Sequence, residues 1–362
     1  MRLNHFQHYR RRSIGAQLPD GRIVDLPAAA AAWLAFERQD PLWEAEVQLR
    51  LPSDLGRFLA AGKPSLALAS EAVKYAQRIT TRAGIGGEPL FVNLSDIRLL
   101  PPLTPPLILA SGARFDAGSG SLADDVWRHR EFFMRDPFNM LGPADAIQLP
   151  TWLSNDFDLT ARLAVVIGQT LRGASPEEAA EAVFGYCPVI DVCARAQQQI
   201  SWAGALFHVQ YPHAHAFDGS LMLGPSVVSK DELDFSAART TRIFIDGEEV
   251  AQRAPALSIK DVIDWICRLS ETVTLQPGTL FVPGSADDTA VRPARHGKFP
   301  VELVGQTASQ SHRLRPGARV TLTLDKAPVI ETTIQFIDKE EAGSHVKPAF
   351  EASCDGDAVP RR

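Results

Sequence analysis

The chain has 362 residues, of which 45% are hydrophobic and 22% charged, and this composition is typical of a globular protein with a sizeable core. Its formal net charge of -6 provides no basic surface of the kind that attracts nucleic acids or acidic membranes. No apolar run approaches the ~20 residues of a membrane-spanning helix, and the four cysteines lack a CxxC spacing, which favours reduced thiols. We therefore expect a soluble, cytoplasmic protein that binds a small molecule, and neither nucleic acid nor a membrane.

The first hundred residues predict a small domain with a hairpin and helices. The stretch "AQLPDGRIVDL" has an Asp20-Gly21 turn between two apolar runs, which is typical of a β-hairpin. Residues 27–37 and 64–82 have helical character. The stretch "LPPLTPP" then interrupts any regular element, so we expect a domain of residues 1–102 and a second domain that begins at residue 103.

Residues 155–168, "NDFDLTARLAVVIG", predict a strand with two different halves. Its first half alternates, so that Asp156, Asp158, Thr160 and Arg162 share the face opposite to that of the apolar residues. From Leu163 onward the residues are uniformly apolar, as in a strand that is buried on both faces. The pattern therefore predicts a polar row at the mouth of a core strand.

Further elements follow in chain order. Residues 175–186 predict a helix, with Ser175 as its cap and two glutamates in its first turn. Residues 239–250 and 318–334 predict antiparallel hairpins, and residues 258–271 predict a helix between them. The tail, residues 338–362, is polar and is expected to be disordered, which makes 103–337 a β-rich mixed domain.

A second polar row follows in "DVCARAQQQISWAGALFH". If this stretch is a helix, Asp191, Arg195 and Gln198 fall at i, i+4 and i+7 and hence on one face. The alternative is an ordinary surface ion pair on an amphipathic helix, because exposed pairs of this kind are common and weak.

Together with "REFFMRDPFNMLGPADAIQLP", "FIDGEEVAQRAPALSIKDVIDWICRLSETVTLQPGTLF" and "RPGARVTLTL", the stretches above make the chain resemble the fumarylacetoacetate hydrolase family. The resemblance runs from about residue 103 to residue 334, and the N-terminal part is similar to the small β-rich domain of longer members. It implies an α+β, β-rich fold, namely a mixed β-roll that usually forms a homodimer and has its active site at the mouth of the roll.

The resemblance also implies a metal site, which this sequence alters. Members bind Mg²⁺ or a similar hard cation through a glutamate pair on the alternating strand and a following aspartate, because such ions prefer carboxylate oxygens. The aspartate corresponds to Asp191, but the glutamate pair falls on Thr160 and Arg162. Because a guanidinium cannot coordinate a cation, we expect no metal, with Asp191 as the one retained ligand if a divalent cation does bind.

Other expectations also rest on the resemblance. It implies substrate-binding roles for Arg195 and Gln198, and for Ser285 in place of a loop threonine. The histidine and glutamate that activate water in the family correspond to Gly118 and Ser121, neither of which can act as a general base. The family's lysine corresponds to Ala205, which follows Gly204, so hydrolysis by the usual route is not expected.

Arg162 has two interpretations. It could face the cleft with Arg195, where fixed positive charge would favour a carboxylate or an enolate oxygen, or it could simply pair with Asp156, Asp158 or Asp191. The first interpretation makes Arg162 and Arg195 catalytic and assigns Thr160 and Asp191 to substrate binding. Asp156 and Asp158 lie too far along the strand to replace the lost metal ligands.

The histidines are candidates for the missing base. His208, His213 and His215 crowd into "FHVQYPHAHAF" and could supply a base or bind a softer metal such as Zn²⁺, although closely spaced loop histidines more often face solvent. Of these, His208 is the candidate for proton transfer. His129, before Phe132, is a further candidate but fits a helix surface better.

Three functions remain open at this point. The first, which we favour slightly, is an enzyme that acts on a carboxylated small molecule, an oxo-acid or β-dicarbonyl, through an enolate and without Mg²⁺, as a C–C lyase, decarboxylase, hydratase or cyclase. The second is a catalytically inactive member that binds a small acid or supports a partner subunit. The third is a metal-dependent C–C bond hydrolase with substitute ligands. Fold kinship alone does not decide among them.

Overall fold

The computed structural model describes thirteen stretches of the chain, namely residues 1–79, 82–111, 114–115, 132–197, 200–203, 206–209, 211–233, 241–253, 259–283, 290–293, 301–304, 314–324 and 327–340. The predicted tail beyond residue 340 and the segment that contains Gly118, Ser121 and His129 lie outside these stretches. None of the described helices has the length and apolar character needed to cross a membrane.

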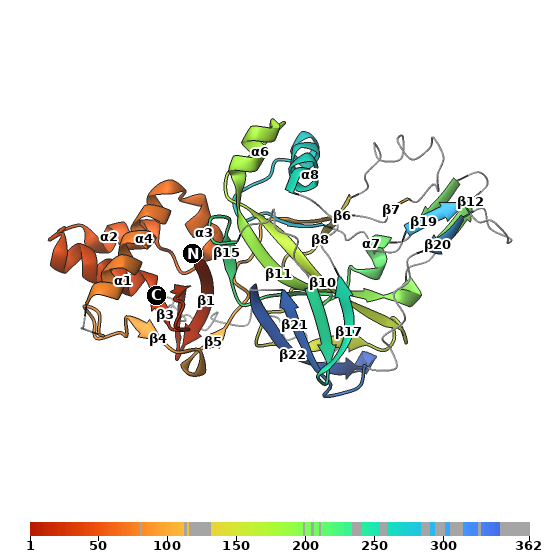
Figure 1. Ribbon diagram of the computed structural model, residues 1–362, viewed down its shortest axis with the longest axis horizontal. Coiled ribbons are helices and arrows are strands. Elements are labelled where there is room, and N and C mark those ends of the chain that lie inside the picture. Colours follow the sequence, from red (N-terminus) through yellow and green to blue (C-terminus); the bar gives the residue numbers. More distant parts are fainter. Residues whose placement is uncertain are drawn as a thin grey trace, which may run out of the picture.

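A large mixed sheet runs through both halves of the chain (Figure 1). Its described strands follow the order β4-β3-β2-β1-β15-β11-β10-β18-β6-β8, with β5 paired to β1 and β14 paired to β11. The strands are β1 (Arg2–His8), β2 (Arg11–Gln17), β3 (Ile23–Asp25), β4 (Phe91–Val92), β5 (Arg98–Leu99), β6 (Ile108–Ser111), β8 (Phe132–Arg135), β10 (Phe157–Ile167), β11 (Val183–Ala194), β14 (Leu221–Leu223), β15 (Val227–Ser229) and β18 (Leu280–Val282).

The N-terminal part combines its strands with a group of helices. The predicted hairpin is confirmed, because β2 pairs with β3 and Gly21 takes the positive φ of 87° that the turn needs. Both predicted helices are present, the first as α1 followed by a π-helical turn and the second as α4, which ends at Arg78 rather than at residue 82 because Ile79 is already extended. The helices are α1 (Leu26–Ala32), η1 (Trp33–Glu37), α2 (Trp43–Arg50), α3 (Leu55–Ala60), α4 (Lys63–Arg78) and the short η2 (Leu94–Asp96).

The N-terminal part and the rest of the chain share one sheet and one core. Arg2 and Leu3 of β1 pair with Val228 and Val227 of β15. Leu3 belongs to the same buried cluster as Val166 of β10 and Leu280 of β18. The predicted boundary near residue 102 falls in the connection between β5 and β6, and the hydrogen-bonded sheet continues across it.

A second sheet packs against the outer half of β10 and β11. Its strand order is β17-β16-β21-β22-β9, and both predicted hairpins are confirmed, with Asp246 and Gly247 at positive φ in the first. The strands are β9 (Ile147–Pro150), β16 (Thr241–Ile245), β17 (Glu248–Arg253), β21 (Arg319–Leu324) and β22 (Ala327–Ile337). Phe157, Leu159 and Ala161 of β10 form a buried cluster with this sheet, so the polar row of β10 lies on the opposite face.

Smaller elements complete the described fold. The predicted helix at 258–271 is confirmed as α8, whereas the helix predicted at 175–186 ends at Ala182, because Val183, Phe184 and Tyr186 already belong to β11. The α+β, β-rich class is confirmed. The remaining elements are α6 (Pro176–Ala182), η3 (Arg195–Gln197), α7 (Tyr211–Ala214), α8 (Ile259–Thr272), β7 (Arg114–Phe115), β12 (Ile200–Ala203), β13 (Leu206–Val209), β19 (Ala290–Pro293) and β20 (Val301–Val304).

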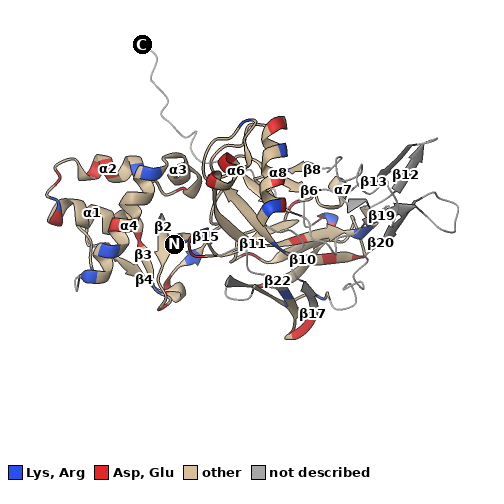
Figure 2. Cartoon of the chain, turned by 45° about the horizontal axis from the view of Figure 1, so that its top comes forward, with Lys and Arg blue, Asp and Glu red and all other residues tan. Residues whose placement is uncertain are grey.

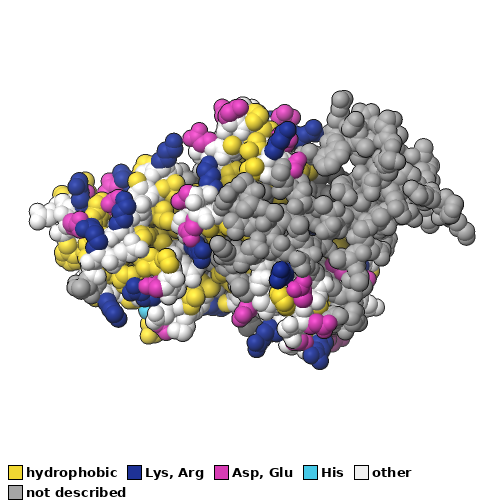
Figure 3. Space-filling view, viewed as in Figure 1, with side chains coloured by type: hydrophobic (Ala, Val, Ile, Leu, Met, Phe, Trp, Pro, Cys, Tyr) yellow, Lys and Arg dark blue, Asp and Glu magenta, His cyan; other side chains and the backbone are white. Residues whose placement is uncertain are grey.

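Apolar side chains remain on the surface of the N-terminal helices. Phe36, Leu42 and Leu49 are exposed, and Figure 3 shows hydrophobic side chains gathered on this part of the molecule. Exposed apolar residues of this kind are common singly and mark an interface only when they are contiguous. The homodimer therefore stays a prediction.

Candidate functional site

The polar row of β10 lies directly beside Asp191 and Cys193 of β11. The two strands are antiparallel, and Thr160 is paired with Asp191 while Asp158 is paired with Cys193. Side chains opposite one another in an antiparallel pair point to the same face, so Asp158, Thr160 and Arg162 share a face with Asp191 and Cys193. Figure 2 shows charged residues along β10 at this place.

Asp191 and Arg195 do not lie on one common helix. The prediction of one helical face with Asp191, Arg195 and Gln198 is wrong, because Asp191 belongs to β11 and Arg195 begins the short η3. The strand is buried along nearly its whole length, between β10 on one side and β14 and β15 on the other. A strand that is buried on both faces shows no period-2 alternation, so its sequence was open to a helical interpretation.

Asp191 is the centre of a buried cluster of charges. Its Oδ1 accepts a hydrogen bond from Arg135 Nη1 at 2.6 Å and lies 3.1 Å from His215 Nδ1. Its Oδ2 lies 2.9 Å from Arg162 Nε. All four side chains are at most 5% exposed. One carboxylate is therefore in contact with two guanidinium groups and an imidazole.

The charges in this cluster shift the pKa of its members in opposite directions. Burial disfavours the ionised form of Asp191, but His215, Arg135 and Arg162 outweigh burial and hold the pKa of its carboxyl well below the ordinary range. Burial likewise disfavours the charged form of His215, but Asp191, aided by a hydrogen bond with Cys193, raises the pKa of His215 to about 9. At neutral pH His215 is therefore protonated and Asp191 ionised.

Arg162 and Arg195 belong to two separate ion pairs. Arg162 contacts Asp191 and also donates from Nη1 to the carbonyl oxygen of Pro283, at 3.2 Å. Arg195 instead forms an ion pair with Asp158, and its backbone N–H donates to the backbone carbonyl oxygen of Asp156. The interpretation in which Arg162 pairs with an aspartate therefore matches the structure, and a substrate contact of Arg162 or Arg195 stays a prediction.

The other predicted site residues are described only in part. Thr160 is half-buried opposite Asp191. His208 lies in β13 opposite Ser201, but its side chain is outside the described part, as are Gln198, Gly204, Ala205 and Ser285. His213 is exposed, which matches the expectation for a loop histidine, whereas its neighbour His215 is 3% exposed.

Sequence reasoning missed Arg135, a member of the cluster, and its hydrogen-bond partner Ser220. Arg135 ends the short strand β8, and Ser220 lies just before β14; both are buried. Arg135 Nη2 donates to Ser220 Oγ at 2.8 Å. The signal for Arg135 was present, because Phe133 and Arg135 are two residues apart in "FFMR" and so share one face of a strand. Ser220 had no comparable signal.

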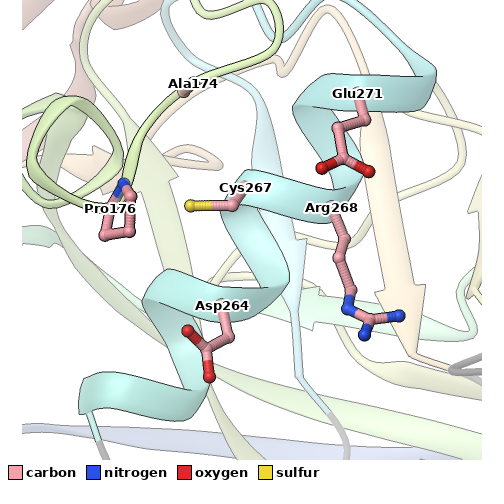
Figure 4. Close-up of a pocket in the computed structure, with 6 residues that line it drawn as sticks. All are labelled: Ala174, Pro176, Asp264, Cys267, Arg268 and Glu271. Atoms are coloured by element: carbon pink, nitrogen blue, oxygen red, sulfur yellow. The ribbon is translucent and has the colours of Figure 1, made fainter. Parts of the chain in front are cut away.

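A shallow pocket lies elsewhere, between the start of α6 and the side of α8 (Figure 4). It measures about 360 Å³ and is lined by Ala174, Pro176, Asp264, Cys267, Arg268 and Glu271. Burial and the nearby Asp264 raise the pKa of the Cys267 thiol, which makes it a poor nucleophile. The pocket contains no residue of the predicted site.

Comparison with models of protein families identifies the family of this chain. The model described as "Fumarylacetoacetate (FAA) hydrolase C-terminal" matches residues 116–335, more than half of the chain. The chain belongs to the fumarylacetoacetate hydrolase family. Within this family, one relative is the oxaloacetate tautomerase YisK of Bacillus subtilis, 23% identical over 90% of this chain and 97% of the relative. Another is the mitochondrial oxaloacetate tautomerase fahd2 of Xenopus laevis, 28% identical over 80% of this chain and 81% of the relative.

Solved structures of fumarylacetoacetate hydrolase relatives share the fold. The enzyme from Exiguobacterium antarcticum has a TM-score of 0.62 at 20% identity, over 93% of this chain and 100% of that one. Maleylpyruvate hydrolase from Sphingobium sp. SYK-6, solved in complex with manganese(II) ion and pyruvate, has a TM-score of 0.58 at 18% identity, over 93% of this chain and 99% of that one. At these identities the likeness shows the fold alone.

The residues at the family's metal position do not fit a divalent cation. Such an ion needs several oxygen ligands, and here Asp191 is engaged by Arg135, Arg162 and His215 instead. Within the described stretches, no three His, Cys, Asp or Glu side chains are grouped so as to hold a metal ion. A guanidinium in contact with the carboxylate also repels a cation at close range.

Proposed function

We propose that this chain is an enolate-forming enzyme that interconverts the keto and enol forms of a small oxo-dicarboxylate such as oxaloacetate, and that it does so without a divalent cation. The observation that carries the proposal is the buried cluster in which Arg135, Arg162 and His215 meet Asp191. Fixed positive charge of this kind stabilises a developing oxyanion because it is pre-oriented and largely shielded from water.

The charge of the cluster suits an acidic ligand. Among the described side chains in contact with Asp191, three are cationic at neutral pH, which leaves a net charge of +2 on the four groups. Buried charge favours a partner of opposite sign. A dicarboxylate would supply this charge, and its enolate oxygen would be held by guanidinium N–H donors.

Keto–enol interconversion makes modest demands on the protein. One proton moves between the carbon next to the carbonyl group and the carbonyl oxygen. The reaction therefore needs a charge that stabilises the enolate and a group that carries the proton, but no activated water. His215, protonated at neutral pH, can donate a proton within the same cluster. The positions of the family's water-activating dyad carry Gly118 and Ser121, which favours this reaction over hydrolysis. The two relatives above, both named oxaloacetate tautomerases, support the same choice.

The test follows the loss of enol absorbance in fresh oxaloacetate solutions. Wild-type protein should accelerate the decay, and Arg162→Leu should lower kcat/KM by about 100-fold or more, because a charge that stabilises the enolate is removed. The matched control is Arg315→Leu, since Arg315 is exposed and pairs with Asp246 on the surface. It should stay within about twofold of wild type. Thermal unfolding of each variant separates lost activity from lost folding.

Chelation tests the metal-free part of the proposal. The rate should survive dialysis against a chelator, and elemental analysis should find no stoichiometric Mg²⁺, Mn²⁺ or Zn²⁺. Activity that disappears on chelation and returns with Mn²⁺ would instead establish the metal-dependent alternative. Product analysis by NMR in the same assay detects decarboxylation, C–C cleavage, hydration or cyclisation, which proceed through the same enolate.

A second candidate is a non-catalytic binder of a small acid. It is favoured by one observation, that Asp191 is already paired with Arg135 and Arg162, which help to hold the pKa of its carboxyl low and so make it a poor proton acceptor. Calorimetry with malonate, which resembles the substrate but cannot react, measures binding directly. Binding of malonate without any acceleration of oxaloacetate enol decay would favour the binder.

A further inference from the structure

The hydroxyl of Ser220 closes a ring of hydrogen bonds with the Asp191 cluster. Arg135 and His215 both contact the same oxygen, Asp191 Oδ1. Arg135 Nη2 donates to Ser220 Oγ at 2.8 Å, and Ser220 Oγ donates to the carbonyl oxygen of His215 at 2.7 Å. The hydroxyl therefore links the guanidinium of Arg135 to the backbone of His215, while Asp191 links the same guanidinium to the imidazole of His215.

Three separate segments meet in this ring. Arg135 ends β8, the terminal strand of the large sheet in its described order, and His215 follows the short helix α7. Ser220 itself is held by its backbone, because Val192 N donates to its oxygen at 2.8 Å and its own N–H donates to Phe217 oxygen at 3.0 Å. The serine is thus anchored beside Asp191, in a place from which its hydroxyl can orient the other two segments.

The hydroxyl of Ser220 can hold the two cationic residues close together despite their like charges. A guanidinium and a protonated imidazole that share one carboxylate oxygen repel each other. A neutral hydroxyl that accepts from the first and donates to the backbone of the second keeps both in place without adding charge. Ser220 is 5% exposed, so water does not readily replace the hydroxyl in this role.

We propose that Ser220 is a positioning residue of the candidate site, whose hydroxyl holds Arg135 and the His215 segment in the geometry that an acidic ligand requires. The expected effect of Ser220 on catalysis rests on the proposed function. Its expected effect on the positions of Arg135 and His215 does not. It assigns a role in the site to an uncharged serine whose hydroxyl hydrogen-bonds to Arg135 and to the backbone of His215.

The experiment compares Ser220→Ala with Ser226→Ala. Ser226 is a matched control, because it is also buried, lies in the same segment, and its Oγ has no hydrogen-bond partner among the described residues. Ser220→Ala should lower kcat for oxaloacetate about tenfold or more, since it removes two hydrogen bonds that involve the cationic residues, and change KM less. Ser220→Thr, which keeps the hydroxyl, should restore most of the rate, and Ser226→Ala should leave it within about twofold.

A second readout does not depend on activity. In protein labelled with ¹⁵N-histidine, the ring signals of His215, assigned with His215→Gln, should shift or broaden in Ser220→Ala and stay unchanged in Ser226→Ala. If Ser220→Ala does not fold, the near-isosteric Ser220→Cys takes its place in both measurements. Unchanged His215 signals in the folded variant would overturn the inference even for an active enzyme. If the His215 signals shift but the protein does not act on oxaloacetate, the positioning role of Ser220 is supported and the proposed function is wrong.

Discussion

At the scale of single residues, the site depends on one carboxylate. The sequence identified Asp191 through family resemblance and Arg162 through the alternation of β10, and the structure places the two in contact. The same carboxylate also serves Arg135 and His215. Because Asp191 is the shared partner of three cationic groups, we expect its charge to contribute more to the stability of the fold than the charge of any one of them.

Replacing Asp191 with Asn should therefore destabilise the fold. The substitution keeps the shape but leaves Arg135, Arg162 and His215 buried together without their shared anion, which typically costs about 3–5 kcal/mol. The control is Asp246→Asn, because Asp246 is partly exposed and pairs with Arg315 on the surface, where an ion pair contributes about 1 kcal/mol or less. Urea unfolding at pH 7 measures both; equal losses would show that the cluster is not a unit of stability.

At the scale of elements, the sequence correctly predicted features that depend only on residues close together in the chain. The cap of α6 is an example: Ser175 Oγ accepts from Glu178 N, and Glu178 Oε2 accepts from Ser175 N, so that each satisfies the other. The alternation of β10 also correctly separated its core face from its polar face. It did not show that Asp158 and Arg162 on the polar face are buried, because what covers a face is set by other segments.

The cap makes a testable contribution to α6. Ser175→Ala removes the acceptor for the first turn and should lower the free energy of unfolding by about 1 kcal/mol. Ser175→Asp, whose carboxylate can cap the same turn and favours the positive end of the helix dipole, should retain most of that stability. Hydrogen exchange of the α6 amides localises the effect, and an equal loss in both variants would argue against capping as its cause.

At the scale of the whole molecule, the N-terminal part and the rest of the chain are joined by more than a linker. β1 pairs with β15, and one buried cluster of described residues contains members from both sides of residue 102. Sequence composition suggested a boundary there because prolines interrupt regular structure, but prolines report only on the local backbone. A sheet that crosses the boundary implies that the two parts stabilise each other.

This mutual stabilisation predicts a long-range effect of Leu3, which is fully buried in the shared cluster. Leu3→Ala should lower the free energy of unfolding by about 2–5 kcal/mol and reduce hydrogen-exchange protection in β10 and β11, far along the chain. Leu49→Ala is the control, because Leu49 is exposed and should change stability by about 0.5 kcal/mol or less. Normal protection of β10 in Leu3→Ala would mean that the N-terminal part unfolds independently.

The sequence alone determined the features that depend on neighbours along the chain: the hairpins, the Ser175 cap of α6, the two-faced strand β10, and the absence of carboxylates at positions 160 and 162. Only the tertiary structure decided what surrounds Asp191, because Arg135 and His215 come from positions 56 and 24 residues away. No periodicity encodes such contacts. They exist because the folded chain brings the end of β8 and the segment after α7 to Asp191 of β11, although β10, β18 and β6 separate β8 from β11 in the order of the sheet.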